Sequence, residues 1–411
     1  TIAIGYQAGY ALTSGANNIA IGYTALLNHT TGGDNIAIGK NTMFDTDAGS
    51  TSLGSEHNIF IGLSAGGGVW ADAASNYNVG IGNYSMDAAL NGALNNTALG
   101  HYTLSSLTEG DSNVAIGYNA GGSLTTGGTN ILIGRNAGSS GTDLAYSVMI
   151  GHYAGYSINT NNSQGSVLIG YEAGTNLTSG VNSLIGYYAG RYLSTQGYNT
   201  MYGFEVGQYM NGSSNTFIGY YAGRGSSTSA PYGNGGNNVA LGREALKAIS
   251  SGSYNVAIGR DSLKIATDGD HNIALGYSSG VALTSGDDNV LIGKNTAINL
   301  STGTNNIAIG ENALYLENSG TYAIAIGYRA GYKNRISGTN YNTFMGYNAG
   351  REVTTGNHNT FLGNHAGYGV DGSDADNNVA IGSYSLVNIT GNNNIAIGYE
   401  AGRYASGSSN T

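Results

Sequence analysis

The sequence lacks cysteine and is poor in proline and charge. Its 411 residues include no Cys, one Pro and one Trp, and only 9% of them are charged. The absence of cysteine excludes a disulfide scaffold and thiolate chemistry. A single proline excludes collagen, which needs many. The low charge disfavours a surface of charged helices, because soluble domains usually carry about 25% charged residues.

Positive charge and long apolar runs are also scarce. Fourteen Lys and Arg stand against 24 Asp and Glu, which gives a net charge of −10. This balance argues against an electrostatic nucleic-acid binder. No apolar run approaches the ~20 residues of a membrane span, so we expect no membrane insertion within this segment. Disorder is not expected either, because 40% of the residues are hydrophobic.

Glycine is abundant, with 70 residues, and much of it ends one repeated phrase, Asn-Ile-Ala-Ile-Gly and its variants. We call the last residue of each phrase the strand glycine. There are 23 copies, and 12 of the 22 spacings between them are 17 residues. The others range from 16 to 23 residues. We predict one continuous repeat array over residues 1–411, a segment of a longer fibre protein that begins and ends within a repeat.

Each position of the phrase has its own chemistry. The first strand position, three residues before the strand glycine, is β-branched in 22 copies, and the last, directly before it, is Ile or Leu in 21. Such residues favour strands. Asn precedes them in 19 of 22 copies and is expected to form a ladder of stacked amides. The sequence predicts an all-β fold, a parallel β-solenoid or β-roll of about 23 coils with a dominant 17-residue repeat.

The middle strand position, between the first and the last, is never polar; it holds Ala 12 times and Phe four times. A strand with one wet face should alternate apolar and polar residues. We therefore expect this position, for example Ala20 and Phe217, to be covered by a neighbouring copy of the chain. The simplest assembly is a cyclic homotrimer, intertwined or laterally packed as a fibre.

Two sets of phrases carry a family resemblance. Asn18–Gly22 and Asn113–Gly117 resemble the head repeats of trimeric autotransporter adhesins, which implies a left-handed parallel β-roll with three chains side by side. Asn215–Gly219 and Asn359–Gly363 are similar to repeats of phage tail fibres. The 17-residue spacing is longer than the compact turn of adhesin heads, and no neck, stalk or anchor accompanies it, which leaves the choice open.

These features predict a structural, non-catalytic fibre segment that mediates surface attachment, outside the cell on a cell surface or virion. The expected partners are other copies of the chain and host glycans or surface proteins. A phage tail fibre that binds a host receptor is the alternative. A monomeric ligand-binding or ice-binding solenoid is an alternative from another class, although it would expose the apolar middle position. An enzyme on a β-helix scaffold should carry an irregular acidic cleft, and none is visible.

The position directly after the strand glycine is the candidate ligand-facing site, and we call it the aromatic row. Its varied occupants indicate that it faces solvent. Two interpretations are open: a stacking ladder between coils, or an aromatic platform for glycans or host protein. Tyr fills it at Tyr6, Tyr23, Tyr118, Tyr171, Tyr187, Tyr220, Tyr277, Tyr328, Tyr347 and Tyr399.

Other apparent catalytic or metal-binding motifs are explained by the repeat or by turns. Two matches to the G-x-S-x-G hydrolase motif, around Ser64 and Ser278, place Ser where other copies hold Gln, Asn or Arg. Asp371, Asp374 and Asp376 are a weak calcium candidate without the spacing of an EF-hand, and a solvated turn is favoured. The seven histidines show no metal spacing and are expected at the surface. No metal and no cofactor are predicted.

Overall fold

The computed structural model describes residues 1–47, 54–71, 73–159, 163–225, 232–405 and 407–410. These residues form short β-strands and turns and include no α-helix, and the fold is a parallel β-solenoid of about 22 turns with 17-residue spacing. The all-β solenoid prediction is therefore confirmed. The chain divides into two compact units, Thr1–Asn199 and Thr200–Thr411.

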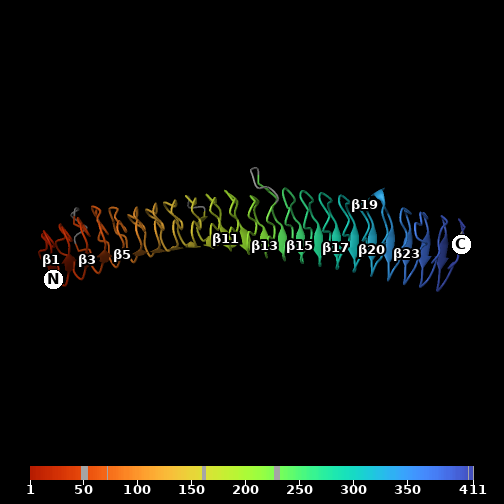
Figure 1. The fold of residues 1–411 in the computed structure, drawn as a ribbon, viewed down its shortest axis with the longest axis horizontal. Helices are drawn as coiled ribbons and strands as arrows, with labels where there is room; N and C mark the ends of the chain where they lie inside the picture. The colour runs from red at the N-terminus through yellow and green to blue at the C-terminus, as the bar shows by residue number, and fades with distance from the viewer. Residues whose placement is uncertain (48–53, 72, 160–162, 226–231, 406, 411) are drawn as a thin grey trace. The chain divides into compact units, whose positions relative to one another are not determined.

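In the first unit, each coil contributes one three- or four-residue strand that pairs in parallel with the strand of the next coil (Figure 1). The register places like on like, so that Ala20 is opposite Ala37. The strands are β1 (Ile2–Ile4), β2 (Ile19–Ile21), β3 (Ile36–Ile38), β4 (Ile59–Ile61), β5 (Val79–Ile81), β6 (Thr97–Leu99), β7 (Val114–Ile116), β8 (Ile131–Ile133), β9 (Val148–Ile150), β10 (Val167–Ile169) and β11 (Asn182–Ile185).

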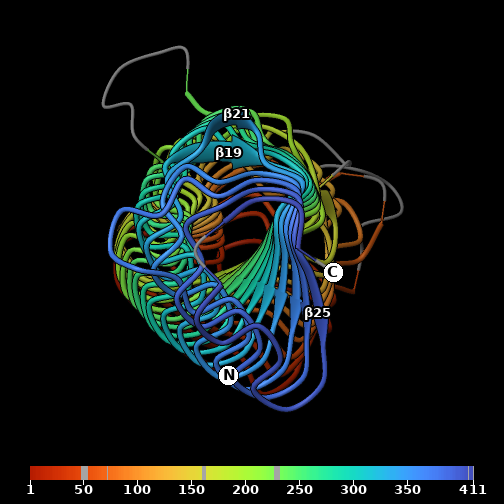
Figure 2. The ribbon, with the colours of Figure 1, turned by 90° about the vertical axis from the view of Figure 1, so that its right-hand side faces the viewer.

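The second unit repeats this arrangement from β12, which begins at the unit boundary. Two further strands, β19 and β21, pair only with each other and lie apart from the column of strands that ends at β25 (Figure 2). The strands are β12 (Asn199–Tyr202), β13 (Thr216–Ile218), β14 (Val239–Leu241), β15 (Val256–Ile258), β16 (Ile273–Leu275), β17 (Val290–Ile292), β18 (Ile307–Ile309), β19 (Ser319–Thr321), β20 (Ile324–Ile326), β21 (Ser337–Thr339), β22 (Thr343–Met345), β23 (Thr360–Leu362), β24 (Val379–Ile381) and β25 (Ile395–Ile397).

Two constraints require glycine at the strand-glycine position: the backbone dihedral angle and the lack of room for a side chain. Gly22 has φ +141°, and a Cβ placed on it would lie 2.2 Å from the carbonyl oxygen of Gly39 in the next coil. Only glycine combines that dihedral angle with so close an approach of two backbones. The chain can therefore turn out of each strand only where glycine follows it.

The Asn position forms the predicted ladder of buried amides. The backbone N–H of Asn35 donates to Oδ1 of Asn18 at 2.9 Å, and Nδ2 of Asn18 donates to the carbonyl of Gly32 at 2.9 Å. The next step repeats the pattern, with Asn58 donating to Oδ1 of Asn35. Both side chains are fully buried, and a buried amide without partners would be costly. The ladder also continues through Ser147, whose N–H donates to Oδ1 of Asn130 at 3.0 Å.

The prediction that a neighbouring copy of the chain covers the middle strand position is wrong. Ala20 and Phe217 are 0% exposed in the single chain, because this position points into the coil. It packs there against the rest of its own coil, where the small residue three after the strand glycine is also buried, as at Ala25 and Ala222. The first and last strand positions, such as Ile19 and Ile21, point outward instead. A coil that curves back on itself has its own interior, so no second chain is needed to cover the middle position.

In most of the described coils, interior volume is balanced between the middle position and the residue six later. Phe217 is followed by Gly223, and a Cβ on Gly223 would lie 2.3 Å from the phenylalanine ring. In the next coil, Ala240 is followed by Leu246, and both side chains are fully buried. Leu246 has φ +49°, close to the +53° of Gly223. Large and small residues therefore exchange places across the same space, which is the rule of a close-packed interior.

This balance predicts the outcome of exchanging the two residues. Phe217→Ala alone should cost about 3–5 kcal/mol, because it leaves a cavity. Gly223→Leu alone should also destabilise the coil, because its side chain meets the ring. The double variant should recover all but about 1–2 kcal/mol, the cost of a non-glycine residue at positive φ. Denaturant unfolding, with hydrogen exchange of residues 216–218, measures this; a double variant no more stable than the weaker single would contradict the pairing.

Candidate functional site

The aromatic row forms stacked pairs in several neighbouring coils. The rings of Tyr6 and Tyr23 lie 5.1 Å apart with 15° between their planes, and those of Tyr171 and Tyr187 lie 5.2 Å apart at 14°. Tyr328 stacks on Tyr347 at 5.2 Å. The row is solvent-facing, with Tyr6 at 61% and Tyr171 at 39% exposure. The coil repeat therefore brings these tyrosines together as a ladder.

Basic residues continue the row where tyrosine is absent. Lys40 lies over the ring of Tyr23 at 5.8 Å, and Arg135 lies over that of Tyr118 at 5.8 Å. Arg243 and Arg260 lie in the same way over Tyr220 and Tyr277. Tyr399 lies in the last described coil and is 73% exposed.

Stacking changes what the aromatic row can offer a ligand. Within a stacked pair, each ring covers one face of its neighbour, so edges and hydroxyl tips remain for solvent. Two of the tips are engaged within the chain: a side-chain hydrogen bond with Tyr220 raises the pKa of Tyr221 to about 12, and one with Glu172 raises the pKa of Tyr171. A sugar that needs an open ring face is therefore served only where a stack ends. Glycan binding by this row stays a prediction.

A second aromatic row, directly before the Asn ladder, was missed by the sequence reasoning. Tyr254 and His271 stack at 5.0 Å with 5° between planes, and His57 stacks on Tyr77 at 5.1 Å. Residues of this row have positive φ, such as +61° at Tyr254, which turns the side chain away from the coil. The signal was present in the sequence, because Tyr or His recurs one residue before Asn.

The outward side of the main strands forms a regular apolar surface. We call the first and last strand positions together the outer aliphatic face. They are half-buried or exposed along successive strands; Leu99 is 46% exposed, Ile131 40%, Leu241 44% and Ile273 38%. A monomeric soluble protein rarely exposes so regular an apolar surface. The face that lacks a cover is therefore the Ile/Val face and not the alanine face.

The weak calcium candidate is not assembled into a cluster. Asp371 forms an ion pair with Lys333 at 2.8 Å, and Oδ1 of Asp376 accepts a hydrogen bond from the backbone of Asn357 at 2.7 Å. Asp374 is exposed. Within the described ranges, no group of three or more His, Asp or Glu is placed to hold a metal ion. The same residues contain no helix long and apolar enough to cross a membrane.

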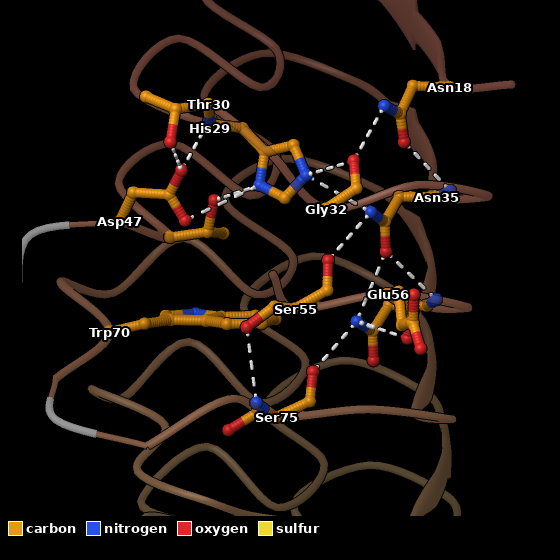
Figure 3. A network of polar contacts seen from close by, with 12 residues as sticks. Asn18, His29, Thr30, Gly32, Asn35, Asp47, Ser55, Glu56, Trp70 and Ser75 are labelled. Carbon is orange, nitrogen blue, oxygen red and sulfur yellow. Dashed lines mark hydrogen bonds and ion pairs between the residues drawn. The ribbon is translucent and has the colours of Figure 1, made fainter. Parts of the chain in front are cut away.

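One histidine is buried, contrary to the expectation of seven surface residues. His29 is 0% exposed and lies in a network of polar contacts (Figure 3). It stands seven residues after its strand glycine, the position that Leu12 holds in the preceding coil. Its Nε2 lies 2.9 Å from the carbonyl of Gly32, and its Nδ1 lies 2.7 Å from the hydroxyl of Thr46. A carbonyl can only accept, so the neutral ring carries its proton on Nε2 and accepts the Thr46 hydroxyl at Nδ1.

The carboxylate of Asp47 completes this buried network. It accepts hydrogen bonds from the backbone and hydroxyl of Thr30, and its Oδ1 lies 3.8 Å from Nδ1 of His29. His, Thr and Asp thus lie together, but the side chains of His29 and Asp47 are at most 2% exposed. Among the described residues the ring is shielded from solvent, so we interpret the arrangement as part of the packed interior.

Comparison with known proteins does not assign this chain to a family. No protein-family model, no curated protein and no solved structure matches this chain. The resemblance to adhesin heads and tail fibres therefore stays an expectation.

The buried histidine predicts a pH dependence. Burial lowers the pKa of His29 below its usual 6.5, against the opposing effects of Asp47 and the Gly32 carbonyl. Below pH 6.5 the unfolded chain takes up the proton more readily than the folded coil. The free energy of unfolding therefore decreases as the pH decreases, until the pH reaches the lowered pKa that His29 has in the folded state. Hydrogen exchange of the coil, followed with the fluorescence of nearby Trp70 between pH 7.5 and 5, measures it.

The matched variant is His29→Leu, which copies the preceding coil and removes the titrating group. Its stability should change less over this pH interval than that of the wild-type chain. An identical pH response in both chains would show that His29 is not the group responsible.

Proposed function

We propose that this chain is a non-catalytic structural segment of an extracellular attachment fibre, in which copies associate side by side through the outer aliphatic face. The observation that carries the proposal is that face itself. An antiparallel or parallel sheet whose outward side is apolar is normally covered, and the cover that matches a repeating surface along its whole length is an identical repeating surface. A cyclic homotrimer closes such contacts without leaving an open edge.

The other polar features of the coil support a structural role. The amide ladder and the buried network around His29 form their hydrogen bonds inside the coil. Along the outside, ion pairs such as Arg224 with Glu205 at 2.8 Å join one coil to another. These groups hold neighbouring coils together, which supports a structural role.

Repetition suits attachment, because many weak sites on one fibre act together and avidity replaces single-site affinity. The aromatic row and the second aromatic row would meet host glycans or surface proteins by their edges and hydroxyl tips. The setting is a bacterial adhesin on a cell surface or, as the alternative, a phage tail fibre on a virion that binds a host receptor.

A monomeric ligand-binding or ice-binding solenoid is a second candidate. The objection raised from the sequence, that a monomer would expose the middle position, no longer holds, because the single chain buries Ala20 and Phe217. The outer aliphatic face would then be the binding surface, with the regular strand spacing of ~4.8 Å along it. Thermal hysteresis of the monomer would favour this candidate.

The proposal predicts that charge on the outer aliphatic face separates the copies. Leu241→Lys, Ile258→Lys and Ile273→Lys together place three cations on successive strands, at positions 38–44% exposed in one chain. The isolated coil should still fold, because these side chains point outward. Self-association should weaken ~100-fold or more, because an unpaired charge is costly to bury. Light scattering should give three times 41.9 kDa for the wild-type chain and 41.9 kDa for the variant.

The matched control is Ser251→Lys, Ser285→Lys and Thr302→Lys, which adds the same charge at exposed turn positions of the same unit. It should keep the wild-type mass. A wild-type chain that is monomeric at every concentration, or a control that dissociates as readily as the variant, would overturn the proposal.

A further inference from the structure

A hollow of about 480 Å³ lies in the second unit beside the small sheet of β19 and β21. Three successive coils contribute to its lining. The pairing of β19 with β21 aligns Ser319 with Ser337 at its edge. The apolar part of the lining comes from Leu316 and Ile336, and Ile336 is 8% exposed. The lining therefore combines apolar and polar side chains, the usual composition of a small-ligand site.

Arg335 on this rim differs from every other basic residue. Of the 14 Lys and Arg, all within the described ranges, thirteen form an ion pair or lie over an aromatic ring. Among these described residues, Arg335 alone does neither. Its side chain is exposed, and its backbone N–H donates to the carbonyl of Thr354 at 2.7 Å. The guanidinium is thus the unneutralised cation of this surface and faces no competing carboxylate partner.

Hydrogen-bonding capacity surrounds the guanidinium. Oδ1 of Asn318 accepts from Ser301 at 2.8 Å, so its Nδ2 donors remain for a ligand. Nδ2 of Asn299 donates to the carbonyl of Tyr315 at 2.8 Å, so its Oδ1 remains. The aligned serine hydroxyls add groups that both donate and accept. Such a set matches a ligand with several hydroxyls.

A buried carboxylate holds the two sides of the hollow together. One oxygen of Glu317 accepts from the backbone of Asn318 at 3.0 Å and of Gly320 at 2.9 Å. The other accepts from Nδ2 of Asn340 at 2.9 Å. Glu317 is 0% exposed, and burial raises its pKa against these hydrogen bonds. It is a positioning residue that joins the β19 segment to the β21 segment and points away from solvent.

We propose that this hollow binds an acidic monosaccharide, a pyranose that carries a carboxylate. The planar guanidinium of Arg335 matches a carboxylate by two parallel hydrogen bonds. The serine and asparagine groups match ring hydroxyls, and Leu316 and Ile336 contact a face of C–H groups. The volume falls within the ~300–1,000 Å³ of small-ligand sites. This inference deepens the proposed attachment role by naming its ligand class, and it rests on that role for its setting.

The test titrates the full chain with methyl glucuronide and with methyl glucoside, which differ only in the carboxylate, using ligand-observed NMR. We expect the glucuronide to bind at least tenfold more tightly. Arg335→Gln should remove this preference, whereas Arg403→Gln, an arginine outside both aromatic rows whose side chain is 35% exposed, should leave it unchanged. Both side chains reach solvent, so circular dichroism should report an unaltered fold.

Equal binding of the two sugars, or a preference that survives Arg335→Gln, would overturn the proposal. Sodium sulfate serves as a bare anion, and competition by sulfate as effective as by the glucuronide would also overturn it, because the hydroxyls would then contribute nothing. The same titration on the triple lysine variant separates the two hypotheses: loss of self-association shows in light scattering, and loss of this site shows in the titration.

Discussion

The structure depends on in-register stacking, in which each residue lies beside the equivalent residue of the next coil. Because each strand pairs with its equivalent in the next coil, every side chain meets the same position of its neighbours at the strand spacing. A position must therefore be able to contact copies of itself. Asn18 and Asn35 can do so, because an amide both donates and accepts. Tyrosine can do so by stacking, as Tyr6 does on Tyr23. Like charges can recur at one position, as Arg243 and Arg260 do, because each pairs with an acid at the next residue.

The same constraint divides the coil into an inside that is closed and an outside that is not. Inside, the amide ladder satisfies the polar groups, and bulk at the middle position is balanced six residues later, as in Phe217 with Gly223. Outside, Ile, Val and Leu at the first and last strand positions are stacked in rows that their own chain covers only in part. The apolar outside is thus a product of the strand alternation, and it is the reason for proposing a second copy as its cover.

Irregular coils carry the features on which local chemistry depends. Where the inward turn position changes from Leu to His29 or Glu317, the interior needs new partners, and each polar side chain collects several hydrogen bonds. At Glu317 these bonds also join β19 to β21 and shape the hollow beside Arg335. A local site therefore arises where the sequence departs from the repeat, whereas the regular positions form rows of like side chains.

The repeat phrase by itself determined the parallel solenoid, the turn at each strand glycine and the amide ladder, because these depend on the spacing and on what one residue type can do beside itself. Only the tertiary structure decided which strand face is the interior. Alternation separates Ala20 from Ile19 and Ile21 but does not say toward which side the coil curves. The lone Arg335 and the buried His29 were likewise invisible, because pairing and burial depend on residues some 17 positions away that meet only when the coils stack.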